Sequence, residues 1–537
     1  MKKQFLSVIG ASAWLIAATA HAQAPADANN QGAADQSSGP SELAPPPAEP
    51  SSEPPAQAEM GAKVELPAAD AAADQKAATK APSAADAAAA PAQPTVFQTP
   101  EGWPVQVPAG ANEHILFYGF AELDIMHDTT QSYPNDGSNN FSIARPGTVP
   151  GDNGQLQFTA RNSRFGIKLE TSEYHGMKGL AQAELDFYGN QAPTASEGSI
   201  YTNAPIRMRH YFLTLKTPVV DVLAGQYHDL FGWGGNGFYP NTVAFLGLPG
   251  EIYHRNPQLR LSKVFKSDAV DFEIAAAAVR PVGRAGEIPD GEAGLRLTVN
   301  KWKGVKAQGS GPPDAGPLAV GVSGVGRHFR VNPFSSIVGD YKTATGWGVA
   351  GDLVIPVIPC TKEDMSNAVT ITGEATMGAG ISDLYSGLSG GARYPALPNP
   401  LLQNPAPVYN ANLDPGIVAF DDNGNLADIH PIKWKGLVAG AQYHLPIMMG
   451  KLVWISGVFA LVQSDNLESL TPAAAKGTIW TKAQYFDGNV FVAITPAVQL
   501  DLSYQVSQQT YADIDPATGD RVKATNDRAE FAMHYFF

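Results

Sequence analysis

The last ten residues, Arg528–Phe537, read Arg-Ala-Glu-Phe-Ala-Met-His-Tyr-Phe-Phe and decide the fold. Successive side chains of a β-strand point to opposite faces of the sheet. Here one face would carry Ala529, Phe531, Met533, Tyr535 and Phe537, and the other Arg528, Glu530, Ala532, His534 and Phe536. The stretch therefore predicts a strand with one face toward lipid and the other toward a water-filled lumen.

The same alternation recurs upstream, and it predicts an all-β chain that closes into a transmembrane antiparallel barrel. A soluble β-sandwich also alternates, but it would not usually follow an export signal and end on an aromatic residue. We expect strands near 115–126, 156–170, 177–189, 206–217, 220–231, 256–265, 269–280, 291–301, 317–329, 343–357, 367–381, 432–445, 450–464, 478–494, 498–510 and 526–537.

Short and long connections alternate along most of this pattern, as they do when turns lie at one membrane face and loops at the other. The span 302–316 fits least well, because it is long for a turn. Sixteen strands is the best count, with fourteen or eighteen as the alternatives. A barrel of sixteen strands is wide enough for an aqueous channel, whereas side chains fill one of eight.

The first 22 residues have the layout of a signal peptide. Lys2 and Lys3 precede an apolar run from Phe5 to Ala18, and Ala20-His21-Ala22 then places small residues at the two positions a signal peptidase reads. We expect residues 1–22 to be removed on export across the inner membrane of a Gram-negative cell.

Residues 23–110 are expected to be a linker in the periplasm. The stretch is rich in Ala and Pro, and such a composition cannot bury enough apolar surface to offset its ordering entropy. We expect a disordered, semi-extended and mildly acidic tether, followed by the barrel over residues 111–537. A tether to the cell wall or to a partner is the functional alternative.

Composition limits the function classes. The formal net charge of −15 argues against a nucleic-acid partner, which would need a basic face. The single cysteine, Cys360, excludes an intrachain disulfide. None of the 11 histidines stands in a recognisable catalytic arrangement. We expect no enzymatic activity, no metal and no cofactor.

Basic residues gather on the early strands and are candidates to line the pore and guide solutes. They are Arg161, Arg164, Lys168, Arg207, Arg209, Arg260 and Arg296. In this stretch the outward residues change from even-numbered, as Phe158, to odd-numbered, as Phe165. The change implies a bulge near residues 161–163, which should aim Arg161 and Arg164 into the lumen. Either these cations pair with Glu170, Asp186, Glu273 and Glu292, or they form a partly unpaired ladder that guides anions.

The connection 232–255 is the candidate constriction loop. It follows the fifth strand, where porins of this size commonly fold a loop into the barrel. It is rich in glycine and carries the aromatic residues Trp233, Phe238, Tyr239, Phe245 and Tyr253. An ordinary external loop with aromatic packing is the alternative.

Several stretches resemble the DcaP-type porins. They are Arg161–Gly166, Gly179–Asp186, Ile206–Leu215, Val222–Phe231 and Arg255–Leu261, and they occur in order over most of residues 115–265. The resemblance implies a trimer of sixteen-strand barrels that prefers small anions such as dicarboxylates. Family members carry an N-terminal coiled coil, whereas this linker shows no heptads. In resembling porins, the C-terminal aromatic, here Phe537, is part of the signal for the barrel-assembly machinery.

These observations favour a porin in the outer membrane, in contact with lipid and lipopolysaccharide, that lets small hydrophilic solutes diffuse. A general, non-selective or cation-selective porin is the first alternative. The signal peptide carries two lysines and residues 23–100 carry ten acids and three lysines, so residues 101–537 keep −10 of the net charge of −15. A barrel for envelope tethering or adhesion is the second alternative.

The linker should be dispensable for the barrel. Deleting Gln23–Thr95 with the signal retained is expected to leave a heat-modifiable barrel, because the linker supplies no alternating segment. Conductance in a planar bilayer should equal that of the full chain. Loss of assembly in this variant would show that the linker takes part in folding.

Overall fold

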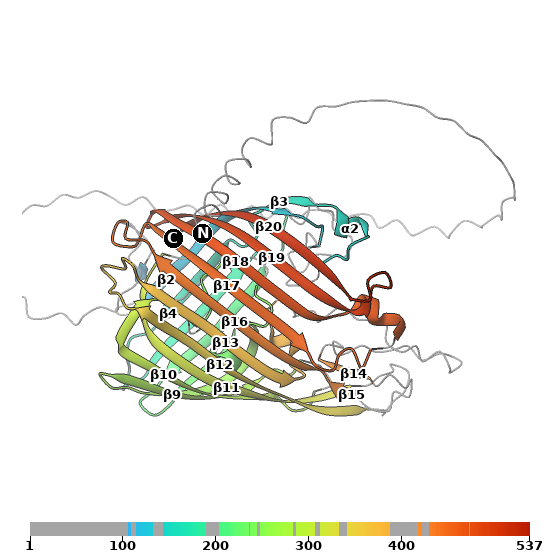
Figure 1. Ribbon diagram of the computed structural model, residues 1–537. Coiled ribbons are helices and arrows are strands. Elements are labelled where there is room, and N and C mark those ends of the chain that lie inside the picture. The colour runs from blue at the N-terminus through green and yellow to red at the C-terminus, as the bar shows by residue number, and fades with distance from the viewer. Residues whose placement is uncertain are drawn as a thin grey trace, which may run out of the picture. The chain divides into compact units, whose positions relative to one another are not determined.

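Sixteen strand positions close into an antiparallel barrel in the computed structural model of the protein (Figure 1). The structure describes residues 106–108, 114–132, 143–189, 203–235, 237–243, 247–282, 286–306, 312–331, 341–386, 417–420, 429–471 and 473–537. The expected signal peptide and the linker up to residue 105 lie outside these residues.

The strands of the first half of the barrel are β2 (His114–Asp128), β3 (Gln155–Thr159), β4 (Arg164–Glu170), β5 (Lys178–Asp186), β6 (Arg207–Lys216), β7 (Asp221–His228), β8 (Arg255–Phe265) and β9 (Val270–Val279). Those of the second half are β10 (Asp290–Val305), β11 (Ala315–Val331), β12 (Lys342–Ile358), β13 (Val369–Ala379), β16 (Lys433–His444), β17 (Val453–Ser464), β18 (Trp480–Thr495), β19 (Val498–Ile514) and β20 (Arg521–Phe536). β3 and β4 share one position, because both pair with β2. The sequence-based count of sixteen is therefore confirmed.

Short elements lie in the connections between barrel strands. They are α2 (Val149–Asp152), η2 (Phe231–Trp233), η3 (Ser382–Leu384), η4 (Ala473–Thr478) and the small sheet of β14 (Val418–Phe420) with β15 (Ile429–Pro431). No helix in the described ranges has the length and apolar character needed to cross a membrane.

The alternation of side chains follows the predicted pattern. On β18, Phe486 is 57% exposed on the outer face and its neighbour Asp487 is fully buried on the inner face. Polar residues of the inner face can meet water or one another, whereas an apolar outer face suits lipid. The pattern thus explains both where the strands lie and which face of each strand points outward.

The barrel closes where β2 pairs with β20, in register from Phe120 with Phe536 to Asp128 with Arg528. Beyond this ladder, Phe537 exchanges two backbone hydrogen bonds of 3.0 Å with Gly119. Gly119 is required there, because a Cβ at this position would lie 2.1 Å from the carbonyl oxygen of Arg164. The last residue of the chain therefore completes the seam.

A short strand, β1 (Gln106–Pro108), extends the seam on the side of the N-terminus. It pairs with His114–Leu116 of β2, beyond the point where β20 ends. The sheet therefore begins within the last residues of the stretch assigned to the linker, because the first residues of β2 would otherwise keep an unpaired edge.

The connections differ in length at the two ends of the barrel. One end has tight turns such as 217–220, 266–269 and 496–497, and the other has longer connections such as 187–206, 229–254 and 380–432. Outer-membrane barrels have short periplasmic turns and longer external loops, which orients the chain. The span 302–316 fits better than expected, since β10 and β11 extend into it and leave a turn of 306–314.

Removing Phe537 should impair assembly. The deletion removes two seam hydrogen bonds and the C-terminal aromatic residue of the closing strand. We expect a lower yield of barrel in the outer membrane, measured by heat-modifiable migration, while the purified chain still refolds in detergent. A Phe537→Tyr variant, which keeps the backbone and an aromatic ring, is the control. Equal yields for the deletion and the full chain would contradict this role.

Candidate pore constriction

The connection 229–254 enters the lumen directly after β7. The backbone N–H groups of Leu230 and Phe231 donate to Oε2 of Glu292 over 2.7 and 3.0 Å, and that of Gly232 donates to Ser323 Oγ over 2.8 Å. Glu292 lies on β10 and Ser323 on β11, three and four strands further round the barrel. The loop therefore turns inward and meets the wall within four residues of β7.

The middle of the loop reaches strands still further round. Asn241 Nδ2 donates to Gln442 Oε1 on β16 over 3.1 Å, and the hydroxyl of Thr242 donates to Asp487 on β18. The backbone carbonyl of Asn241 accepts from Ser456 Oγ on β17. Polar side chains of the inner wall thus provide the hydrogen bonds that water would give an external loop.

The return of the loop to β8 is held by a second segment that also enters the lumen. Ile252 N–H donates to Glu374 Oε1 over 2.6 Å, and Tyr253 N–H donates to the carbonyl of Leu384 over 3.1 Å. Ser386 N–H donates to the carbonyl of Glu251 over 2.7 Å. Burial raises the pKa of Glu251 to about 8, so this loop side chain is neutral at pH 7.

Arg327 on β11 holds the second segment, 380–386, against the wall. Its guanidinium donates to both carboxylate oxygens of Asp383 over 2.6 and 2.8 Å, to Asp290 over 2.8 Å and to the carbonyl of Gly380. The arginine is almost fully buried. A buried guanidinium needs such compensation, since an unpaired one would carry a large desolvation penalty.

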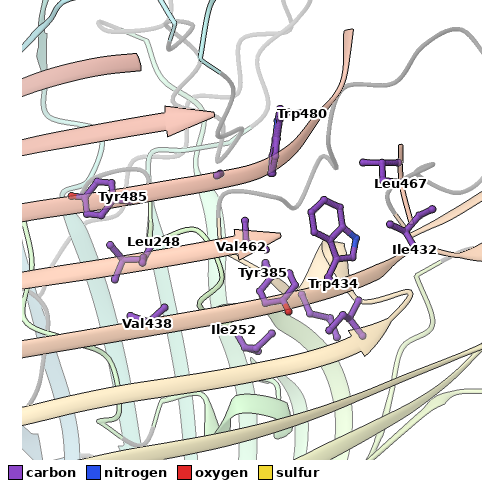
Figure 2. Packing of buried hydrophobic residues seen from close by; sticks show 14 of the residues in the cluster. Leu248, Ile252, Tyr385, Ile432, Trp434, Val438, Val462, Leu467, Trp480 and Tyr485 are labelled. Carbon is purple, nitrogen blue, oxygen red and sulfur yellow. The ribbon is translucent and has the colours of Figure 1, made fainter. Parts of the chain in front are cut away.

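An apolar core joins both segments to the wall. Figure 2 shows Leu248 and Ile252 of the loop and Tyr385 of the second segment packed beside Val438 of β16. All four side chains are buried, although they lie inside the barrel. The constricting segments are therefore fixed by hydrophobic burial as well as by hydrogen bonds.

The predicted aromatic residues of the loop divide into two groups. Trp233 and Phe238 are buried against the wall, and Trp233 Nε1 donates to the carbonyl of Val322 over 3.1 Å. Gly321 of β11 makes room for this indole, since a Cβ there would lie 2.6 Å from it. Tyr239 and Tyr253 instead contact one another beside the early strands, with ring centroids 5.0 Å apart. Phe245 lies outside the described residues.

The predicted cations Arg161, Arg164 and Lys168 of the early strands each contact a carbonyl, a carboxylate or an aromatic ring. The strand breaks between β3 and β4 at residues 160–163, where the bulge was expected. Arg161 Nε donates to the carbonyl of Phe187 over 3.0 Å, and Arg164 Nε lies 3.6 Å from Glu184 Oε1. Lys168 lies over the ring of Tyr118.

A second bulge, in β6, turns Arg207 and Arg209 toward the inner face of the barrel. The register shifts opposite Glu184 and Leu185, so that Arg209 and His210 are both buried on the inner face. Arg207 forms a bidentate pair with Asp186, and Arg209 donates to Glu184 and Asp186, each over 2.8 Å. The paired alternative therefore holds for these two arginines, for Arg164 through Glu184, and for Arg296 through Glu273.

Arg260 differs from them because its acceptors are neutral. Its guanidinium donates to Gln258 Oε1 over 2.9 Å and to the carbonyl of His228. Arg255, at the start of β8, likewise donates to the hydroxyl of Tyr253 over 3.2 Å. Within the described part of the chain, neither arginine forms an ion pair. Of the expected carboxylate partners, Glu292 binds the loop backbone and Glu170 binds Lys178.

We call these cations the basic strip: Arg161, Arg164, Lys168, Arg207, Arg209, Arg255, Arg260 and Arg296. Every member except Arg209 lies over an aromatic ring. The distances from the cation to the ring centroid are 4.8–5.6 Å. A cation over a ring gains about 0.5–2 kcal/mol. The rings therefore hold the long side chains in place and reduce the number of their conformations.

Carboxylates gather elsewhere on the inner wall. Glu122 and Asp124 of β2, Asp501 of β19 and Glu530 of β20 are all buried, and His534 Nε2 lies 2.7 Å from Asp501. The lumen thus has a basic sector on β4–β8 with part of β10, and an acidic sector around the seam. The two sectors adjoin, since β2 pairs with β4, and charged groups in a narrow passage act on the solutes that pass.

Sequence reasoning missed Arg255 and the segment 380–386. Arg255 lies an even number of residues from the outward Leu259 and would be expected to point outward too. It contacts Tyr253 in the lumen because it is the first residue of β8. In 380–386, the signal was the apolar set Ile381, Leu384 and Tyr385 directly after β13. That set does not by itself distinguish an in-folded segment from a strand end.

Comparison with known proteins supports the architecture. No family model matches the chain. No curated protein matches it either. The outer membrane channel DcaP of Acinetobacter baumannii matches with a TM-score of 0.52 over 80% of this chain and 99% of that one, at 16% identity. The chain has the fold of an outer-membrane channel.

Two further solved structures are similar at lower scores. An anion-selective porin from Comamonas acidovorans has a TM-score of 0.42 at 9% identity, covering 79% of this chain and all of that one. Salmonella typhi OmpF, in a complex with daunomycin, has a TM-score of 0.41 at 12% identity, covering 81% and 100%.

Removing the carboxylate of Glu292 should loosen the loop. Glu292→Ala leaves two buried N–H groups without their acceptor, at a cost of about 1–3 kcal/mol each. We expect a larger and noisier single-channel conductance in a planar bilayer. Glu292→Gln keeps an acceptor oxygen and should behave like the unmodified protein. Unchanged conductance in the alanine variant would mean that the loop does not set the width of the pore.

Proposed function

We propose that the protein is an outer-membrane porin through which small hydrophilic solutes diffuse, with a preference for small anions such as dicarboxylates. The observation that carries the preference is the pair Arg255 and Arg260, which donate to neutral acceptors beside the in-folded loop. Arg255 is half-buried, so its charge is available to a passing carboxylate, and buried Arg260 adds positive charge beside it. A guanidinium binds carboxylates with two parallel hydrogen bonds.

The net charge of the chain favours the opposite preference. Selectivity is set where the passage is narrowest, however, because water is restricted there and few charges are close. Two charges about 4 Å apart interact by about 4 kcal/mol at an effective dielectric of about 20. Acids on outer loops that lie beyond a Debye length of about 8 Å are largely screened. The acidic sector lies in the lumen, so it supports the alternative of a non-selective or cation-selective porin.

The resemblance to DcaP-type porins supports three further proposals. The barrels would associate as homotrimers, which the mass of the detergent-solubilised protein measures. The exported chain would be inserted by the barrel-assembly machinery, with Phe537 as part of its signal, and would contact lipopolysaccharide. The linker would lie in the periplasm.

The double variant Arg164→Ala with Arg260→Ala should weaken the anion preference. Reversal potentials in a salt gradient are expected to show anion selectivity for the unmodified protein and a smaller one for the double variant. Arg330→Ala, which removes an arginine paired with Glu287 outside the basic strip, is the control and should change nothing. A clearly cation-selective unmodified channel would contradict the proposal and leave a general porin.

A further inference from the structure

The hydroxyl oxygen of Tyr253 lies between two arginines. Arg209 Nη2 donates to it over 3.0 Å, and Arg255 Nη1 donates to it over 3.2 Å. The Arg255 guanidinium also lies 5.1 Å from the centroid of the same ring. An oxygen that accepts from two cations is in the environment that favours its anionic form.

Tyr253 is fixed in this position from the other side. Its backbone N–H donates to the carbonyl of Leu384, and the rings of His228 and Tyr239 lie 5.1 and 5.0 Å from its own. The residue therefore joins the in-folded loop to the basic strip at the level of β6 and β8.

The charges around Tyr253 do not cancel. Arg164, Arg207 and Arg209 face the carboxylates of Glu184 and Asp186. With Arg255, four guanidinium groups therefore face two carboxylates, which leaves two positive charges. The titratable and charged groups of the elements packed around Tyr253 are Arg164 on β4, Glu184 and Asp186 on β5, Arg207, Arg209 and His210 on β6, Tyr227 and His228 on β7, Asp229, Tyr239, Glu251 and His254 in its own loop, Arg255 and Arg260 on β8, Glu374 on β13, and Asp383, which Arg327 holds.

We propose that Tyr253 is a titratable, specificity-determining residue of the pore. Its phenolate form neutralises one of the two remaining positive charges and weakens the preference for anions. This inference rests on the proposed anion preference and assigns its control to one residue of the loop.

The direction of the pH dependence follows from the surroundings. Burial alone would raise the pKa of Tyr253, but Arg209, Arg255 and Arg164 outweigh burial and lower it to about 7. Below that pH the phenol is neutral and both positive charges act on the solute. Above it the phenolate is present, so anion preference falls as pH rises. Burial raises the pKa of the neighbouring Tyr239, which therefore stays neutral over this range.

The test uses the full chain in planar bilayers with a salt gradient, between about pH 5.5 and about pH 7.5, below the pKa of about 8 of Glu251 and where an ordinary tyrosine stays protonated. For the unmodified protein, we expect the anion-to-cation permeability ratio to fall by about a third across this range, since most of one of two charges is lost. Tyr253→Phe keeps the ring but lacks the oxygen, and should hold the low-pH ratio throughout. Tyr211→Phe, on the exposed outer face of β6 away from the lumen, is the matched control and should follow the unmodified protein.

A spectroscopic measurement separates tyrosine from the nearby histidines, whose protonation would change selectivity in the same direction. The ultraviolet absorbance of phenolate should increase by one tyrosine near pH 7 in the unmodified protein and in Tyr211→Phe, and should not do so in Tyr253→Phe. Heat-modifiable migration of each variant checks that the barrel has folded.

The outcomes distinguish this inference from the proposed function. Anion selectivity that does not change with pH, or that still changes in Tyr253→Phe, would overturn the role of Tyr253 and leave the anion-preferring porin intact. A channel without anion preference even at low pH would overturn the proposed function, whatever the absorbance shows, and the role of Tyr253 with it.

Discussion

The rest of the structure depends on the requirement that every backbone N–H and C=O group within the bilayer has a partner. The ladder from β2 round to β20 meets it for the wall, and the two hydrogen bonds between Gly119 and Phe537 complete it at the seam. Because the backbone is satisfied by the wall itself, the side chains are left to deal with lipid on one face and water on the other. The outward Phe486 and the inward Asp487 are one such pair.

Two chain segments enter the interior of the barrel, and their backbone N–H and C=O groups also need hydrogen-bond partners. Polar residues of the inner face accept hydrogen bonds from these backbone groups, namely Glu292, Ser323, Glu374 and Asn489. These residues and an apolar core fill the side of β10–β18, whereas the cations lie on β4–β8. The inner wall that these segments do not cover therefore carries guanidinium groups on β4–β8 and carboxylates around the seam of β2 and β20.

The sequence predicted the wall well because the period of two is imposed by strand geometry and is visible in any ten residues, as in Arg528–Phe537. It predicted the inward cations on β4 and β8 for the same reason. Arg209 was uncertain because a bulge breaks the period, and Arg255 was missed because it lies at a strand end. The pairing of each arginine, and the course of 380–386 into the lumen, depend on contacts between residues far apart in the chain, which no local pattern contains.

The manner in which the loop is held has a consequence for how such a pore can diverge. Glu292, Ser323 and Glu374 bind the N–H groups of Leu230, Phe231, Gly232 and Ile252, which are buried against the wall, so the anchoring uses no residue that faces the solute. Related barrels could therefore exchange the residues that face the solute while keeping the same aperture. Solute preference and aperture would then vary separately in this architecture, the first through loop side chains and the second through the wall.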